Sequence, residues 1–343
     1  MLVSSLFQLS FVVAALWPNT RTQEHKNTSV SSLLDKNFTT TIKAVCCFIV
    51  MLSHIGLNEK YQLLGCFHWI AVSFFFLFSG FGLTVSTLTK PDYLKFFYKR
   101  FFKVLIPYAA VLFINYCFNF PIGSIGIFYV NVILLFYAMY YVIHRFIKKN
   151  PDIFVCIFIV LYSLFIQFYV DSRVSRENLL SYFGWANQSI AFIYGIVIAK
   201  KLDYFKKILF EKRILIFCIC ILLISTLTPL YISRRNIYYI SWAQYFLRII
   251  LVSAFILCIF VITQNMRLGN KIILYIVNLS YYIFLLQGVV IKLIQKLQLY
   301  DKLQPSFIVI LICVLTFLLS ILFSHIVLFF TFCSKKFLNR VRR

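Results

Sequence analysis

Acidic residues are scarce in this chain: 10 Asp and Glu stand against 34 Lys and Arg among its 343 residues. Only 13% of the residues are charged, whereas 62% are hydrophobic and the mean hydropathy is +0.89. No soluble domain of ordinary composition is so apolar. A net charge of +24 would suggest nucleic acid as the partner of a soluble protein. Here the positive-inside rule explains it better, so we expect the lipid bilayer, and not nucleic acid, as a partner.

The sequence also lacks Cys-x-x-Cys pairs and long polar stretches. Its ten cysteines all lie in apolar runs, a pattern that argues against metal ligation and disulfides and favours packing roles. The largest gap between apolar runs is roughly 25 residues, too short for a soluble domain. Internal repeats and the Gly/Pro-broken helix pairs of many secondary transporters are not recognisable, which weighs weakly against transport.

Apolar runs of membrane-spanning length recur from end to end of the chain. Because they are unbroken, they favour helices over the alternating strands of a β-barrel. We therefore predict an all-α polytopic membrane protein with about ten transmembrane helices. The predicted spans lie near 42–58, 66–89, 104–120, 126–147, 152–170, 185–200, 214–232, 241–264, 273–294 and 306–333.

The loops between these spans differ sharply in charge. With the N-terminus in the cytosol, cytosolic segments hold 25 of the 34 Lys and Arg residues and external segments hold 8, while Arg248 lies inside a span. Since Lys and Arg concentrate in cytosolic loops, both termini are predicted to be cytosolic.

The first 41 residues form an N-terminal hydrophobic segment and a polar cytosolic linker. The apolar part, Leu2 to Trp17, is short for a span. It is consistent with an extra hydrophobic helix, an interfacial helix or a misassigned start. Residues 42–333 form the predicted transmembrane domain, and residues 334–343 form a basic cytosolic tail.

His54 is the first candidate for chemistry. An imidazole inside an apolar span must find polar partners where water is absent, and it can take a proton from a hydroxyl and return it within one cycle. The alternative is a packing histidine bonded to a neighbouring helix. The same two interpretations apply to His325 in the last span, whereas His68 and His144 lie near span ends and are typical of the interface.

Lys43 precedes His54 by eleven residues. Three helical turns place both on a similar face, about 16 Å apart along the axis. Lys43 then lies near the cytosolic surface and His54 in the outer half of the membrane. A flanking lysine that reaches towards lipid head groups is the alternative for Lys43.

A basic cluster of Lys99, Arg100 and Lys103 follows the second span on the cytosolic side. Arg100 and Lys103, three residues apart, would share one helix face and could bind phosphate. Positive-inside flanking would also explain these charges.

Three motifs in order resemble the membrane-bound acyltransferase 3 family. The first is Lys43-x10-His54. The second, residues 72–81, reads Val-Ser-Phe-Phe-Phe-Leu-Phe-Ser-Gly-Phe and ends in small residues that allow close helix contact. The third, residues 100–107, reads Arg-Phe-Phe-Lys-Val-Leu-Ile-Pro. Family members typically show Arg/Lys-x10-His, Phe-Phe-x-x-Ser-Gly and Arg-x-x-Arg-x-x-x-Pro in this order.

Weaker echoes extend the resemblance to about residues 40–333. Residues 128–140 resemble the family's aromatic fourth span, residues 192–195 its Phe-x-x-Gly helix, and residues 279–286 its Ser-Tyr-x-x-Tyr-Leu segment. Two positions depart from the pattern. Lys103 replaces the second arginine of the turn, which keeps the charge but weakens bidentate phosphate recognition. Gln287 stands where many members carry a second histidine.

The resemblance implies acyl transfer from a cytosolic acyl-CoA, usually acetyl-CoA, to a hydroxyl of a cell-surface polysaccharide or lipid-linked glycan. Donor phosphates would rest on Arg100 and Lys103, with Lys43 assisting, and His54 would act as general base without a metal or a covalent enzyme intermediate. The pantetheine arm is about as long as the Lys43–His54 separation. We expect a multi-pass protein of a bacterial plasma membrane, with no appended hydrolase-like domain to complete the transfer.

Three acidic residues on the predicted outer side could orient His54: Glu59, Asp171 and Glu177. The sequence does not identify which one does so, and we favour Glu177. Arg173, Arg176 and Arg248 could hold an anionic or lipid-linked sugar, or screen the nearby acids. The competing hypothesis is a lipid-linked glycan flippase or exporter, which shares the many spans but requires neither His54 nor the basic turn. A glycan polymerase would usually want a large external loop, and the loops here are short.

Overall fold

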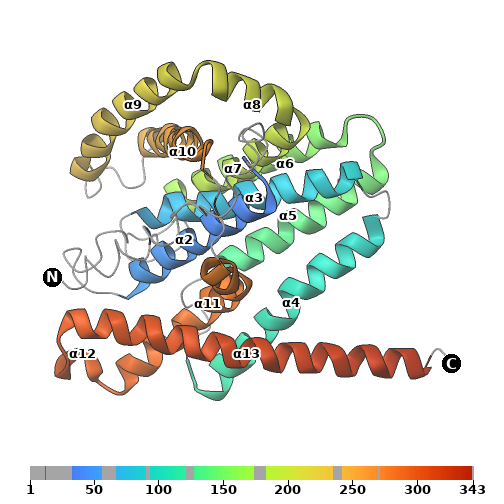
Figure 1. Ribbon diagram of the computed structural model, residues 1–343, viewed down its shortest axis with the longest axis vertical. Helices are drawn as coiled ribbons and strands as arrows, with labels where there is room; N and C mark the ends of the chain where they lie inside the picture. Colours follow the sequence, from blue (N-terminus) through green and yellow to red (C-terminus); the bar gives the residue numbers. More distant parts are fainter. Residues whose placement is uncertain are drawn as a thin grey trace.

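The computed structural model describes residues 12, 33–55, 67–89, 93–120, 127–173, 183–234, 242–266, 268 and 271–341, and its regular structure over these residues is helical (Figure 1). The helices are α2 (Lys36–His54), α3 (His68–Thr89), α4 (Tyr93–Cys117), α5 (Ile127–Phe146), α6 (Pro151–Arg173), α7 (Phe183–Lys200), α8 (Leu202–Glu211), α9 (Arg213–Arg234), α10 (Trp242–Thr263), α11 (Lys271–Lys296), α12 (Leu299–Lys302) and α13 (Pro305–Val341).

Each predicted span overlaps one long helix, which confirms the all-α polytopic class, although the bounds differ: α2 begins at Lys36 and not near 42, and α4 begins at Tyr93 and not near 104. Eight helices in the described part of the chain are long and apolar enough to cross a membrane. The third and sixth predicted spans correspond to the shorter apolar stretches Lys103–Cys117 of α4 and Gln188–Lys200 of α7. The number of spans and their orientation remain predictions. The short helices α8 and α12 lie in segments that were expected to be loops.

The long helices form a bundle in which α13 runs along one edge and α9 along the opposite edge (Figure 1). Helix α9 leaves most of its apolar side chains uncovered, including Ile214 and Leu222, which are 71% and 62% exposed. Helix α13 likewise exposes Leu322 and Leu328. Because such faces are stable only against hydrocarbon, these edges are the lipid-facing surfaces of the bundle.

The closest helix contact lies between α3 and α7 at two glycines. A Cβ atom on Gly80 would collide with the backbone carbonyl oxygen of Phe192. A Cβ atom on Gly195 would collide with the carbonyl oxygen of Leu77 and lie 2.6 Å from the backbone nitrogen of Phe81. The small residues predicted to allow close helix contact do so, and two separate sequence motifs pack against each other.

We expect Gly195→Ala to destabilise the protein by about 2–3 kcal/mol, because the added methyl meets backbone that cannot rotate away. The midpoint of thermal aggregation in detergent should fall by several degrees. Leu88→Ala on α3 is the control, since Leu88 is 64% exposed and should leave the midpoint unchanged. Equal midpoints for the two variants would show that α3 and α7 can separate without cost.

Helix α2 is fixed at both ends and in the middle. At its start the Phe38 amide donates to the Asp35 carboxylate oxygen Oδ1 at 2.6 Å, an N-terminal cap. At its end the hydroxyl of Tyr300 donates to the Ile55 carbonyl oxygen at 2.6 Å. Midway, the Cys47 thiol contacts the Ser280 carbonyl oxygen of α11 at 3.1 Å. These contacts hold the helix that carries both Lys43 and His54.

Candidate active site

His54 is the last residue of α2 and lies beside Gln287 of α11. The residue as a whole is half-buried, and its Nδ1 atom is buried and has no hydrogen-bond partner in the described part of the chain. His68, the first residue of α3, is close enough to act on it electrostatically. The imidazole therefore lies where the end of α2, the start of α3 and one face of α11 meet.

Gln287 is fully buried, and among the described residues neither its amide nitrogen nor its amide oxygen has a hydrogen-bond partner. Although its side chain neighbours His54, the two do not form a well-aligned hydrogen bond. Burying polar atoms without partners costs about 1–3 kcal/mol for each group. Orphaned polar atoms on two adjacent side chains indicate a place that a polar ligand or water fills.

Lys43 lies about three helical turns from His54 on the same helix, as the sequence predicted. Its ammonium lies 5.6 Å from the centre of the Phe78 ring. It lines a cavity of about 190 Å³ whose other polar lining groups are hydroxyls of Ser79, Ser280 and three tyrosines. The tyrosines are Tyr129, Tyr137 and Tyr281. The hydroxyls of Tyr281 and Ser280 already donate to backbone carbonyls and can only accept further hydrogen bonds, which suits the amide hydrogens of an extended chain.

Three of the aromatic rings that line this cavity pack against one another. Phe75 lies 5.9 Å from Tyr129 and 6.0 Å from Phe284, and Tyr129 lies 5.4 Å from Phe284, between ring centres. Phe284 precedes Gln287 by three residues, so the rings stand about one helical turn below it. His54 does not line the cavity. A donor that reaches His54 from the Lys43 side would pass these rings.

The predicted basic turn lies on α4. Lys103 is exposed, and Arg100 precedes it by three residues on the same helix, although the Arg100 side chain lies outside the described ones. Pro107 has no amide hydrogen to donate to the Lys103 carbonyl, which stays open at this turn. The hydroxyl of Tyr281 donates to the Val104 carbonyl oxygen at 2.7 Å, so α11 also fixes the position of this turn.

Several predicted site residues cannot be placed near His54. Glu177, Arg176 and Glu59 lie outside the described residues, and so do the side chains of Asp171 and Arg173. His325 is exposed on α13. Arg248 is buried in α10, where it donates to the Tyr231 hydroxyl at 3.0 Å and lies 5.3 Å from that ring.

A histidine–carboxylate pair does exist, at the other end of the bundle. His144 Nε2 lies 3.1 Å from the Asp152 carboxylate, which also pairs with Lys200. This cluster joins the ends of α5, α6 and α7, and sequence reasoning missed it because nothing in the sequence placed α7 there. No group of three or more His, Cys, Asp or Glu that could hold a metal occurs among the described residues. The eight cysteines described are free.

Comparison with known proteins places residues 38–325 under one family model. That model is the acyltransferase 3 family, described as an acyltransferase domain. Its range takes in α2 and α11, with Lys43, His54 and Gln287. No curated protein and no solved structure matches the chain.

Proposed function

The chain belongs to the acyltransferase 3 family, and from that premise we propose that it transfers an acyl group, in the first instance acetyl, from cytosolic acyl-CoA to a hydroxyl of a cell-surface polysaccharide or lipid-linked glycan. The membrane would be the plasma membrane of a bacterium. The observation that carries this proposal is the adjacent pair His54 and Gln287, whose buried polar atoms have no hydrogen-bond partner among the residues that the structure describes.

In the proposed reaction the acceptor hydroxyl attacks the thioester carbonyl carbon. His54 takes the hydroxyl proton as the new C–O bond forms, and it returns this proton to the sulfur as the C–S bond breaks. Negative charge develops on the carbonyl oxygen between these two steps. The amide NH2 of Gln287 is the donor that we assign to this oxygen, because a donor aimed at developing charge lowers the barrier.

The donor side of the proposal rests on Lys43, Arg100 and Lys103. The phosphates of acyl-CoA would lie on Lys103, which α4 exposes, and on Arg100 one turn before it, with Lys43 assisting. The pantetheine arm would run through the chamber of about 190 Å³ towards His54. Phe75, Tyr129 and Phe284 would swing aside when the thioester passes and would separate the acyl group from cytosolic water at other times.

The acceptor side of the proposal uses Glu177 to orient His54, and Arg173, Arg176 and Arg248 to hold anionic groups of the sugar. Of these, Arg248 is the one whose side chain the structure describes. Its contact with Tyr231 connects it to α3 near His68. Its partner Tyr231 lies 5.3 Å from Trp69, ring centre to ring centre, and Trp69 follows His68 on α3.

Mass spectrometry of the surface glycans of cells with and without this protein tests the function as a whole. We expect a loss of one acyl mass per modified residue when the protein is absent. Purified protein in lipid nanodiscs should then consume acyl-CoA only when acceptor is present. Transport of a glycan without any change in its mass would instead favour a carrier.

We expect Arg100→Ala to raise the KM for acyl-CoA about ten-fold, the loss of one charge-assisted hydrogen bond, and to leave the KM for acceptor unchanged. The matched control is Lys149→Ala, at an exposed lysine of the α5–α6 loop. An acyl-pantetheine thioester, which lacks the nucleotide phosphates, should be used equally well by the variant and the wild type. Equal damage with both donors would exclude Arg100 as a phosphate contact.

A further inference from the structure

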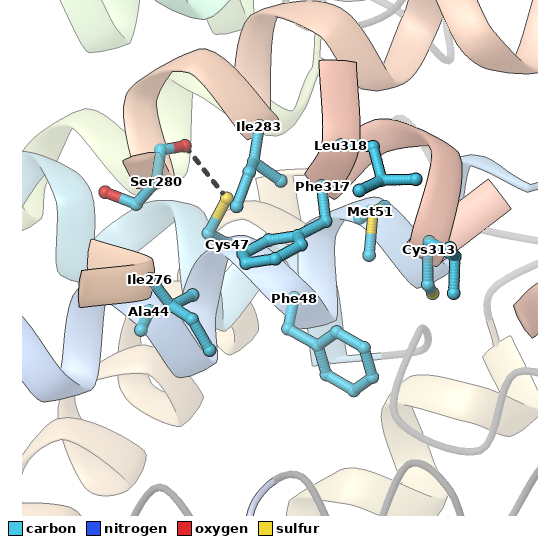
Figure 2. A pocket seen from close by; sticks show the side chains of 11 residues that line it. Ala44, Cys47, Phe48, Met51, Ile276, Ser280, Ile283, Cys313, Phe317 and Leu318 are labelled. Atoms are coloured by element: carbon cyan, nitrogen blue, oxygen red, sulfur yellow. Dashed lines mark hydrogen bonds between the residues drawn. The ribbon is translucent and has the colours of Figure 1, made fainter. Parts of the chain in front are cut away.

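A second cavity, of about 250 Å³, lies between α2, α11 and α13 (Figure 2). Its walls are almost wholly apolar and include Cys47, Met51 and Ile283. The hydroxyl of Ser280, its one polar side chain besides the cysteines, donates to the Val277 carbonyl oxygen at 2.7 Å. A site without a free polar group cannot recognise a sugar or a phosphate, but it can hold hydrocarbon.

The cavity opens towards the lipid along α13. Val314 and Leu318 line it and are 47% and 55% exposed, on the helix that forms one edge of the bundle (Figure 1). An engineered cavity of roughly 150 Å³ takes up a benzene ring from solution, so this space has room for a chain of several carbon atoms. A hydrocarbon chain can enter it sideways from the bilayer without crossing water.

The cavity lies directly below the candidate active site. Met51 precedes His54 by three residues on α2, and Ile283 precedes Gln287 by four on α11, so each pair shares a helix face. From Met51 the cavity continues to Ala44, about 10 Å further towards the predicted cytosolic side. A molecule whose reactive end meets His54 would therefore place its next atoms near the Met51 end of this cavity.

We propose that this cavity holds the hydrocarbon tail of a lipid-anchored acceptor, so that the acyl group is transferred to a glycolipid or lipid-linked sugar and not to a free polymer. The inference rests on the proposed function and narrows its acceptor class. A lipid of the outer leaflet has its head at the outer surface and its tail towards the midplane. That is the direction from His54 into the cavity. The alternative occupant is the acyl chain of the donor. The Lys43 chamber lies on the other side of the α2–α11 contact between Cys47 and Ser280, so this acyl chain would have to fold back around that contact to enter the cavity.

The test supplies acceptors from the source cells in two fractions, the total lipid extract and the water-soluble glycans. Purified full-length protein in nanodiscs of synthetic phosphatidylcholine receives acetyl-CoA, butyryl-CoA or octanoyl-CoA labelled in the acyl carbonyl group. We expect alkali-labile label in the lipid fraction. Label in the water-soluble glycans alone would overturn the inference and leave the proposed function standing, whereas no label in either fraction, from correctly folded protein, would remove the proposed function itself.

A pair of variants on α13 then assigns the tail to this cavity. Val314→Trp should fill its mouth and lower transfer to the lipid fraction at least ten-fold at subsaturating acceptor, without changing the KM for acyl-CoA. Leu322→Trp adds the same ring to an exposed position of the same helix that does not line the cavity, and it should act like the wild type. Equal rates for both variants would show that bilayer lipid, and not the acceptor, occupies the cavity.

Discussion

Replacing His54 by glutamine should lower the turnover number about 10³-fold and leave the KM for acyl-CoA nearly unchanged. Glutamine keeps a polar side chain of similar size but cannot accept and return a proton at neutral pH. General base catalysis contributes about 10²- to 10⁴-fold to such reactions, and this contribution is lost with the imidazole. Because the proposed phosphate contacts of acyl-CoA are Arg100 and Lys103, its binding should not depend on His54. Steady-state kinetics in nanodiscs, with both substrates varied, measure the two effects separately.

His325→Gln is the matched control for this experiment. His325 is also an intramembrane histidine, but it is exposed on α13 and lines neither described cavity. Its replacement should leave the turnover number within two-fold of the wild type, an order-of-magnitude expectation for a surface change. A folded His54→Gln protein with normal turnover would remove His54 from the mechanism and leave the family membership intact.

The sequence predicted the helices because each one must satisfy its backbone within itself and must be apolar over the thickness of the bilayer. For the same reason the Lys43–His54 spacing, a property of one helix, could be predicted and is confirmed. The close contact at Gly80 was predicted from its small side chain. Its partner, Gly195 of α7, was not, since a small residue shows that another helix approaches but does not show which one.

Contacts between helices could not be predicted, because the sequence does not show which helices pack against each other. The sequence shows that Gln287 departs from the family pattern, but not that it lies beside His54. That position depends on the packing of α11 against α2, in which Cys47 contacts Ser280, 233 residues later in the sequence. The ring cluster of Phe75, Tyr129 and Phe284 draws on three helices in the same way. The amphipathic helix α8 was missed because its charged residues were assigned to a cytosolic loop.

In the family resemblance Gln287 stands in place of a histidine, and we propose a different role for its amide. A histidine here could serve as a second proton carrier, whereas an amide cannot be protonated at neutral pH and can only donate or accept hydrogen bonds. In the proposed reaction one base is sufficient, because His54 receives one proton and returns it to the leaving sulfur. What that reaction still needs is a donor for the charged carbonyl oxygen, and the Gln287 amide is fully buried and has no hydrogen-bond partner within the described ranges.

We therefore expect Gln287→Leu to lower the turnover number by about 10²- to 10³-fold, the usual cost of one lost donor at a developing oxyanion, with little change in either KM. Gln287→Glu should be at least as damaging, since its carboxylate repels the same charge, while Gln287→His should retain more activity than either because its ring can donate. Gln167→Leu, at another buried glutamine in α6, is the control for the loss of a buried amide and should keep its turnover once folded. If Gln287→Leu instead lowered thermal stability and left turnover intact, the amide would be a packing residue. In that case the His54 reaction would have to find its donor elsewhere.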